Sequence, residues 1–231
     1  MTKFVIINGW AAPDRIWTEF IEDIEKDSEV LLVDWAPKED LASVIQSFVM
    51  ADSFVLCGWS LGAMEALRLI ADIRDKVSHL ILFSPTSRFV IDPDLQLKIG
   101  WPVSIIKQMQ YWIHKNPDSV LKKFYSQLLK PNSHSVDLKI PTHYEVPYLI
   151  EGLQALIDYN LHELVPKLSH KTLIFHGEED VICPLEAGRK LHVRIKNSHF
   201  VPLSNSGHMP FYTHTNVCLK AVRSFIGERD D

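Results

Sequence analysis

Short apolar runs alternate with segments of helical periodicity along this chain. Each run is rich in Val, Ile, Leu and Phe and is apolar throughout, without the in-and-out alternation of a strand that has one face in water. Such runs are typical of a parallel sheet that helices cover on both faces, so we predict fully buried strands. The runs lie at residues 3–8, 30–34, 53–58, 78–84, 171–177 and 198–204.

Apolar residues at helical spacing fill the gaps between the early runs. They recur over residues 16–24, 41–49 and 63–70, and a last helix is expected at 216–226. A strand followed by a helix and another strand predicts a right-handed crossover between parallel strands. The predicted fold class is therefore α/β, with a mostly parallel sheet of about six strands that is flanked by helices.

The regular alternation stops between residues 86 and 147. Helical periodicity continues there over residues 105–128, but prolines interrupt it. We interpret this stretch as a helical cap inserted at one edge of the sheet. The sheet pattern resumes after an amphipathic helix at 148–162, so the predicted core is one discontinuous domain made of residues 1–85 and 148–231.

The composition is that of a single globular protein with a full-sized core, since 46% of the 231 residues are hydrophobic and 23% are charged. The net charge of −5 gives no overall electrostatic reason to bind nucleic acid or anionic lipid. Three cysteines without a C-x-x-C spacing support neither a disulfide framework nor a zinc site. They fit a reducing compartment best.

The amino-terminal residues lead directly into an apolar run and lack the pattern of a signal peptide. No stretch approaches the roughly 20 apolar residues that span a bilayer. The histidines have no metal-ligand spacing, and the chain has no phosphate-binding loop or dinucleotide-binding glycine pattern. We therefore expect a cytoplasmic protein with no membrane contact, no metal and no cofactor.

The segment after the third apolar run carries the strongest chemical signal. Gly58-Trp59-Ser60-Leu61-Gly62 follows a predicted strand and precedes a predicted helix, which is the context of a G-x-S-x-G nucleophile elbow. The two glycines leave room for a sharp turn that projects the serine hydroxyl, and the dipole of the following helix points its positive end at the reacting centre. Ser60 is the predicted nucleophile.

A serine nucleophile needs a histidine base and a carboxylate that orients the base, in the chain order Ser, Asp, His. Asp180 follows the fifth run and is our candidate acid, with Glu178 and Glu179 as alternatives. His208 follows the sixth run in a glycine turn and is our candidate base. We interpret His176, just before the acidic residues, as a packing or hydrogen-bonding residue.

Together these three motifs resemble the α/β-hydrolase superfamily over nearly the whole chain. The resemblance implies serine hydrolase activity on a carboxylic ester and assigns the backbone N–H groups of Trp10 and Leu61 to an oxyanion hole. Trp10 lies in Asn8-Gly9-Trp10, where the family usually carries histidine at the first position. The donor is the Trp10 backbone, so the departure at Asn8 affects only the internal hydrogen bonding of the loop.

Within the superfamily, the segments around Trp10 and Ser60 resemble the bacterial pimeloyl-acyl-carrier-protein methyl ester esterases of biotin synthesis. Members of that family bind an acidic carrier protein through basic side chains of the cap, which implies a carrier-bound ester as substrate and an acidic carrier protein as partner. Between residues 95 and 140, seven lysines and two aspartates give a balance of +5 in a chain of −5. A cationic cap is complementary to an acidic partner. The alternative is that these lysines only form the solvated face of the cap helices.

Aromatic and basic side chains of the first loop, the elbow and the cap are candidates for substrate contacts. The contacts that we expect come from Trp10, Trp59, Trp112, Phe124, Lys122 and Lys123. With Trp101, Met109 and Tyr125, the aromatic residues of the cap line an acyl pocket or pack the cap. Alternatives to the carrier-bound ester are a small-ester carboxylesterase or thioesterase, a menaquinone-pathway lyase with the same triad, and a catalytically silent binding module.

Overall fold

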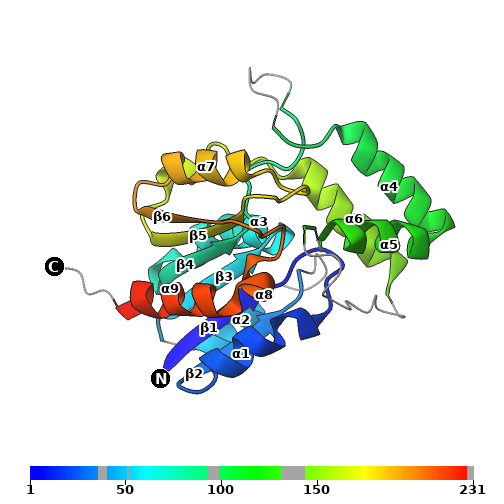
Figure 1. The fold of residues 1–231 in the computed structure, drawn as a ribbon. Helices are drawn as coiled ribbons and strands as arrows, with labels where there is room; N and C mark the ends of the chain where they lie inside the picture. Colours follow the sequence, from blue (N-terminus) through cyan, green and yellow to red (C-terminus); the bar gives the residue numbers. More distant parts are fainter. Residues whose placement is uncertain (36–40, 51, 93–98, 129, 132–143, 228–231) are drawn as a thin grey trace.

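The computed structural model describes residues 1–35, 41–50, 52–92, 99–128, 130–131 and 144–227. Within these residues six strands form one parallel sheet in the order β2-β1-β3-β4-β5-β6 (Figure 1). The predicted strands and the α/β fold class are thereby confirmed. The strands are β1 (Thr2–Ile7), β2 (Ser28–Val33), β3 (Phe54–Trp59), β4 (Val77–Phe83), β5 (Lys171–Gly177) and β6 (Ser198–Leu203).

Helices cover both faces of this sheet. On one face α1, α8 and α9 pack against one another and α9 contacts β5, while on the other face α3 packs on β1, β3 and β4, and α7 packs on β5 and β6. Among the described residues, no helix is long and apolar enough to cross a bilayer. The helices of the two faces are α1 (Thr18–Ile24), α2 (Leu41–Val49), α3 (Leu61–Ile73), α7 (Leu185–Arg194), α8 (Pro210–Thr213) and α9 (Thr215–Gly227), with 3-10 helices at Asp14–Trp17, Arg74–Lys76 and Val165–Lys167.

Three helices lie together beyond the sheet, and we call them the cap helices: α4 (Val103–Lys115), α5 (Pro117–Leu128) and α6 (Val146–Asp158) (Figure 1). Helix α6 packs mainly on α4, although the second predicted core segment begins at residue 148. The helix predicted at 148–162 is shorter than expected, because Tyr159 already adopts an extended backbone. The division into core and cap domains stays a prediction.

The prediction of fully buried strands was wrong for the two edge strands. The central strands are buried along most of their length, whereas most residues of β2 and β6 are half-buried or exposed. An edge strand has a neighbour on one side only, and the helices cover it less completely than the strands at the centre.

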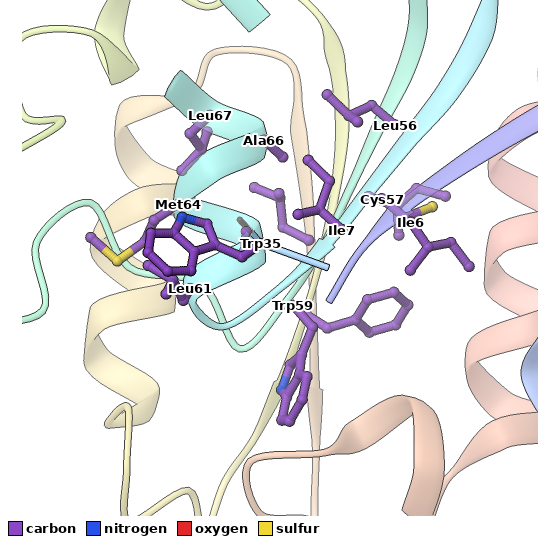
Figure 2. Packing of buried hydrophobic residues seen from close by; sticks show 14 of the residues in the cluster. Ile6, Ile7, Trp35, Leu56, Cys57, Trp59, Leu61, Met64, Ala66 and Leu67 are labelled. Atoms are coloured by element: carbon purple, nitrogen blue, oxygen red, sulfur yellow. The ribbon is translucent and has the colours of Figure 1, made fainter. Parts of the chain in front are cut away.

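The core around the β3–α3 turn is built from aliphatic side chains of two central strands and one helix. Burying each such side chain contributes about 1.5–3 kcal/mol, so this packing holds α3 firmly on β1 and β3. Figure 2 shows Trp59 extending from the end of β3, away from the apolar face of α3. The residues labelled on this part of the core include Ile6, Ile7, Leu56, Cys57, Leu61, Met64, Ala66 and Leu67, all of them buried.

Candidate active site

Ser60 stands alone in the sharp turn between β3 and α3. The strand ends at Trp59 and the helix begins at Leu61, so one residue makes the turn. Its φ of 56° lies in the left-handed region, and its N–H donates to the carbonyl of Phe83 at 3.0 Å. Such a strained conformation persists only where the surroundings hold it, and here it presents the partly exposed Ser60 side chain beyond the sheet.

The two glycines of the elbow are required by close backbone approaches. A β-carbon at Gly62 would overlap the carbonyl oxygens of Ile7 and Asn8, at the end of β1. A β-carbon at Gly58 would lie 2.5 Å from the carbonyl oxygen of Gly62 and 2.7 Å from the Cα of Ala63. The G-x-S-x-G pattern therefore allows the helix to start directly over the ends of two neighbouring strands.

His208 lies in the loop after β6 and contacts both other candidate residues. Its Nε2 is 2.8 Å from Ser60 Oγ, and its Nδ1 is 2.7 Å from Asp180 Oδ2. An ionised carboxylate only accepts hydrogen bonds, so Nδ1 carries the proton and Nε2 accepts the Ser60 hydroxyl proton. Trp59 supports this loop, since its indole N–H donates to the His208 carbonyl at 2.7 Å.

Asp180, in the loop after β5, is buried and held by hydrogen bonds on both oxygens. Its Oδ1 accepts the N–H groups of Ile182 and Cys183 at 2.9 and 2.8 Å, and its Oδ2 faces His208. Burial by itself would raise the carboxyl pKa, but the electrostatic interaction with His208 and the hydrogen bonds from His176 and His208 outweigh it and lower the pKa. The carboxylate is therefore ionised at neutral pH.

The acids next to Asp180 have other partners. Glu179 accepts the backbone N–H groups of Asn205 and Ser206 at 3.2 and 3.0 Å, which ties the acid loop to the loop that carries His208. Glu178 is exposed. Of the three acids that the sequence offers, Asp180 is the one in contact with the His208 ring.

His176 is fully buried behind the acid loop, at the end of β5. Its Nε2–H donates to the Cys183 carbonyl at 2.7 Å, and the same nitrogen lies 3.4 Å from Asp180 Oδ2. A carbonyl only accepts, so the proton is on Nε2. The ring packs on Gly188 of α7, where a β-carbon would overlap Nδ1. His176 thus supports the loop that presents Asp180.

The backbone N–H groups of Trp10 and Leu61 have no hydrogen-bond acceptor among the residues that the structure describes. Leu61 is the first residue of α3, where the helix dipole is positive. Trp10 follows β1 and Leu61 follows β3, and these two strands are neighbours in the sheet. From β1 the chain continues to β2 on one side of this pair, and from β3 it continues to β4 on the other side. Both free donors therefore lie at the switch point where α/β sheets form their sites. Their part in an oxyanion hole stays a prediction.

Asn8 organises the loop that carries Trp10. Its Oδ1 accepts the Gly9 N–H and the Trp17 indole N–H, each at 3.0 Å, and its Nδ2 donates to the Ala12 carbonyl at 3.1 Å and to Asp34 Oδ1 at 3.2 Å. The side chain is fully buried, and every one of these polar contacts is internal. Asparagine at this position therefore still builds an ordered loop.

A cavity of about 600 Å³ lies between the Trp10 loop and the cap helices. Trp10, Trp112, Phe124 and Lys123 line it, so four of the expected substrate contacts border one space. The other lining residues are mostly apolar and come largely from α4, α5 and α6. Ser60 itself is not a lining residue, whereas Trp10, the predicted oxyanion donor, is one.

Two of the expected substrate contacts, Trp59 and Lys122, do not border this cavity. Trp59 is fully buried and does not border the cavity; its indole supports the His208 loop instead. Lys122 is exposed on α5 outside the cavity, because consecutive helical residues point in different directions, and its contact with a substrate or carrier stays a prediction. Tyr125 does not line the cavity either, whereas Trp101 and Met109 do.

Lys98, Asp137 and Lys139 lie outside the described residues. The lysines of the cap that the structure describes are all exposed, namely Lys107, Lys115, Lys122, Lys123 and Lys130.

The geometry suits nucleophilic attack by a serine hydroxyl. Ser60, His208 and Asp180 form one hydrogen-bonded line, and the N–H groups of Trp10 and Leu61, which have no acceptor among the described residues, lie at neighbouring strand ends. Trp10 also lines the apolar cavity. Among the described residues, no group of three or more His, Cys, Asp or Glu side chains is placed to hold a metal ion.

A family model described as serine aminopeptidase, S33, matches residues 38–209. A pimeloyl-[acyl-carrier protein] methyl ester esterase of Legionella pneumophila (strain Corby) is 27% identical over 96% of this chain and 94% of its own length. One of Neisseria meningitidis serogroup A is 24% identical over 97% of this chain and 76% of its own length. An esterase of Exiguobacterium antarcticum has the same fold, with a TM-score of 0.86 and 21% identity over 99% of this chain and 92% of that one. The resemblance drawn from the motifs is confirmed.

Proposed function

The chain belongs to the hydrolase family described as serine aminopeptidase, S33, and on this premise we propose that it hydrolyses a carboxylic ester through an acyl-enzyme on Ser60. The observation that carries the proposal is the hydrogen-bonded line from Ser60 Oγ through His208 to the buried carboxylate of Asp180. Two further observations support it: the N–H groups of Trp10 and Leu61, which have no acceptor in the described part of the chain, and the esterase names of the curated relatives.

In the proposed reaction His208 Nε2 takes the proton of Ser60 as its oxygen attacks the ester carbonyl. The N–H groups of Trp10 and Leu61 bind the oxyanion of the tetrahedral intermediate, while Asp180 stabilises the imidazolium. Collapse of the intermediate transfers the proton to the departing alcohol and leaves the acyl group on Ser60. Water, deprotonated by His208, then attacks the acyl-enzyme, and the acid and free Ser60 are released.

The lining of the cavity favours an ester over a peptide with a free amino terminus. A peptidase that removes amino-terminal residues needs a negative group for the substrate ammonium, since a buried charge must be paired. None of the residues that line the described cavity is acidic, and the charged one is Lys123. An apolar acyl chain fits this lining without an unpaired charge.

We propose further that the substrate is a pimeloyl-acyl-carrier-protein methyl ester, or an ester closely similar to it. The names of the curated relatives support this substrate, and so do the exposed lysines of the cap, which are complementary to an acidic carrier. A cavity of about 600 Å³ is within the range of ligand pockets, and Trp10, Trp112, Phe124 and Lys123 are the proposed contacts. We place the reaction in the cytoplasm, where buried cysteines stay reduced.

The ester-hydrolase proposal is tested with Ser60→Ala. We expect the variant to fold, to lose p-nitrophenyl butyrate turnover by a factor of about 10^5 to 10^6, and to escape labelling by a fluorophosphonate, because the acyl-enzyme cannot form. Wild-type protein is the positive control in both assays. Hydrolysis at the wild-type rate by the variant would overturn the assignment of Ser60, and a wild-type protein inert to both reagents would favour the silent binding module.

The substrate proposal is tested with purified pimeloyl-acyl-carrier-protein methyl ester and with the free methyl ester of the same acid. We expect the carrier-bound ester to have the higher kcat/KM, and the gene to restore growth of a biotin auxotroph that lacks its own esterase. Equal kcat/KM values for the two esters, together with failure to restore growth, would leave a small-ester carboxylesterase as the function.

A further inference from the structure

The loop of Trp10 contains a strained residue directly after the predicted oxyanion donor. Ala11 has a φ of 53°, in the left-handed region that residues with a β-carbon rarely adopt. Strained backbone of this kind persists where surrounding contacts over-determine it. The groups that hold Ala11 in this conformation therefore act on the same short loop that carries the Trp10 N–H.

On the core side of the loop, the Asn8 side chain binds backbone groups on both sides of Trp10 and Ala11. It accepts the Gly9 N–H and donates to the Ala12 carbonyl, so its side chain bridges the residues before Trp10 and after Ala11. These contacts leave the Trp10 N–H and the Ala11 carbonyl for partners outside the loop.

From the cap side, two consecutive residues of α5 contact two consecutive residues of the loop. The Phe124 ring meets the Trp10 ring edge-on, with 4.8 Å between centroids. The Tyr125 hydroxyl lies 2.8 Å from the Ala11 carbonyl oxygen, and since a carbonyl only accepts, the hydroxyl donates. Helix α6 adds a third contact, because the Trp10 indole N–H donates to the Leu149 carbonyl at 2.8 Å.

Tyr125 differs from its aromatic neighbours in the cap. Its side chain is buried, it does not border the cavity, and its hydroxyl reaches across to the core. Burial raises the pKa of its hydroxyl, so the group stays protonated and able to donate. The side chain is therefore positioned to act on the loop that carries Trp10, and it does not border the cavity.

We propose that Tyr125 is a positioning residue of the oxyanion hole: its hydroxyl, held by the cap, fixes the Ala11 carbonyl and with it the orientation of the Trp10 N–H. The inference rests on the proposed ester hydrolysis at Ser60. Stabilisation of the oxyanion then depends on how α5 packs against the Trp10 loop. An intact hydrogen-bonded line from Ser60 to Asp180 is therefore not sufficient for full activity.

The test is Tyr125→Phe, which removes the hydroxyl and keeps the ring. Loss of one oxyanion donor costs a factor of about 10^2 to 10^3 in kcat, so a donor that is misaligned but present should cost about tenfold. We expect this loss in kcat for p-nitrophenyl acetate and for p-nitrophenyl octanoate alike, with KM changed by less than about twofold, because both esters form the same oxyanion.

Binding of a trifluoromethyl ketone supplies the second readout. The ketone forms a hemiketal with Ser60 whose oxyanion occupies the hole, so its inhibition constant should rise by about the same factor as kcat falls. The matched control is Tyr111→Phe, the same chemical change on α4, where the hydroxyl is exposed and has no hydrogen bond in the described structure. We expect the control to match wild type in kcat and in ketone affinity.

The outcomes separate the inference from the function on which it rests. A loss confined to the octanoate ester would assign Tyr125 to the acyl pocket and overturn the inference, as would unchanged kcat and ketone affinity in an active protein. A fall in kcat without weaker ketone binding would indicate general damage and also overturn it. Wild-type protein inactive on both esters would overturn the proposed function and this inference together.

Discussion

Asp180 and Glu179 are adjacent carboxylates with different surroundings, and their substitution separates catalysis from loop support. We expect Asp180→Asn to lower kcat/KM for p-nitrophenyl butyrate by about 10^4, because an amide favours the wrong tautomer of His208 and cannot stabilise the imidazolium. Glu179→Gln is the matched control and should cost less than about tenfold, since its amide oxygen still accepts a backbone N–H from the His208 loop. A larger loss in the Glu179 variant would place the orienting acid one residue earlier.

The candidate triad could be read from the sequence because each member follows a strand within a local pattern of glycine and apolar residues. Ser60 lies between two glycines that the turn requires, and Asp180 and His208 follow β5 and β6. The supporting residues carry no such signal. Asn8 and His176 act through hydrogen bonds to backbone groups that only the folded loops bring near, and Trp59 has a buried supporting role that its position beside Ser60 does not reveal.

The β3–α3 turn is the element on which the site depends most directly. Gly62→Ala would place a β-carbon against the carbonyl oxygens of Ile7 and Asn8, so β1 or α3 must shift. Overpacking of this kind costs about 1–3 kcal/mol, and for a chain of this size each kcal/mol lowers Tm by about 2–4 °C. We expect thermal unfolding to show a Tm lower by several degrees.

The control for this prediction is Gly227→Ala at the end of α9, where an added β-carbon meets no atom of the described residues within 4 Å. Alanine also has the higher helix propensity, so the control should keep or slightly raise Tm. Equal Tm values for Gly62→Ala and wild type would show that the elbow tolerates a side chain and would weaken the steric reading of the motif.

Helices and strands were predicted well where helical periodicity or an apolar run extended over several residues. They were predicted less well where contacts with neighbouring elements determine burial or a boundary. The six strands were found from apolar runs, but their edge or central position depends on the order of strands, which the runs do not encode. Helix α7 was not recognised because charged and polar residues fill much of Leu185–Arg194. The boundary of α6 was missed because Tyr159 leaves the helix without a proline or glycine to mark it.

At the scale of the whole molecule, part of the cap carries positive charge although the net charge of the chain is negative. The chain carries −5, yet α4 and α5 together expose four lysines against Asp118, while α6 carries Glu151 and Asp158. On the proposed function, the anionic body would repel an acidic carrier and the α4–α5 face would attract it, so the field would favour one orientation of approach. The same arrangement leaves small neutral esters unaffected.

Reversal of two cap charges tests this orientation. Lys115 and Lys122 are exposed and lie outside the cavity, whereas Lys123 lines it and is left in place. We expect the double variant Lys115→Glu, Lys122→Glu to raise KM several-fold for an acyl-carrier-protein ester, with p-nitrophenyl butyrate turnover unchanged. Single exposed contacts are weak, but each reversal both removes an attraction and adds a repulsion.

The matched control is Lys196→Glu, Lys220→Glu, which makes the same change in net charge at exposed positions of the core. Steering by a local patch predicts no effect of the control, while a general effect of net charge predicts equal losses in both variants. The difference in KM between cap variant and wild type should shrink as salt approaches 1 M, where the Debye length is about 3 Å. Equal losses on both substrates would instead indicate a misfolded cap, and no loss on either would favour a free small ester as the substrate.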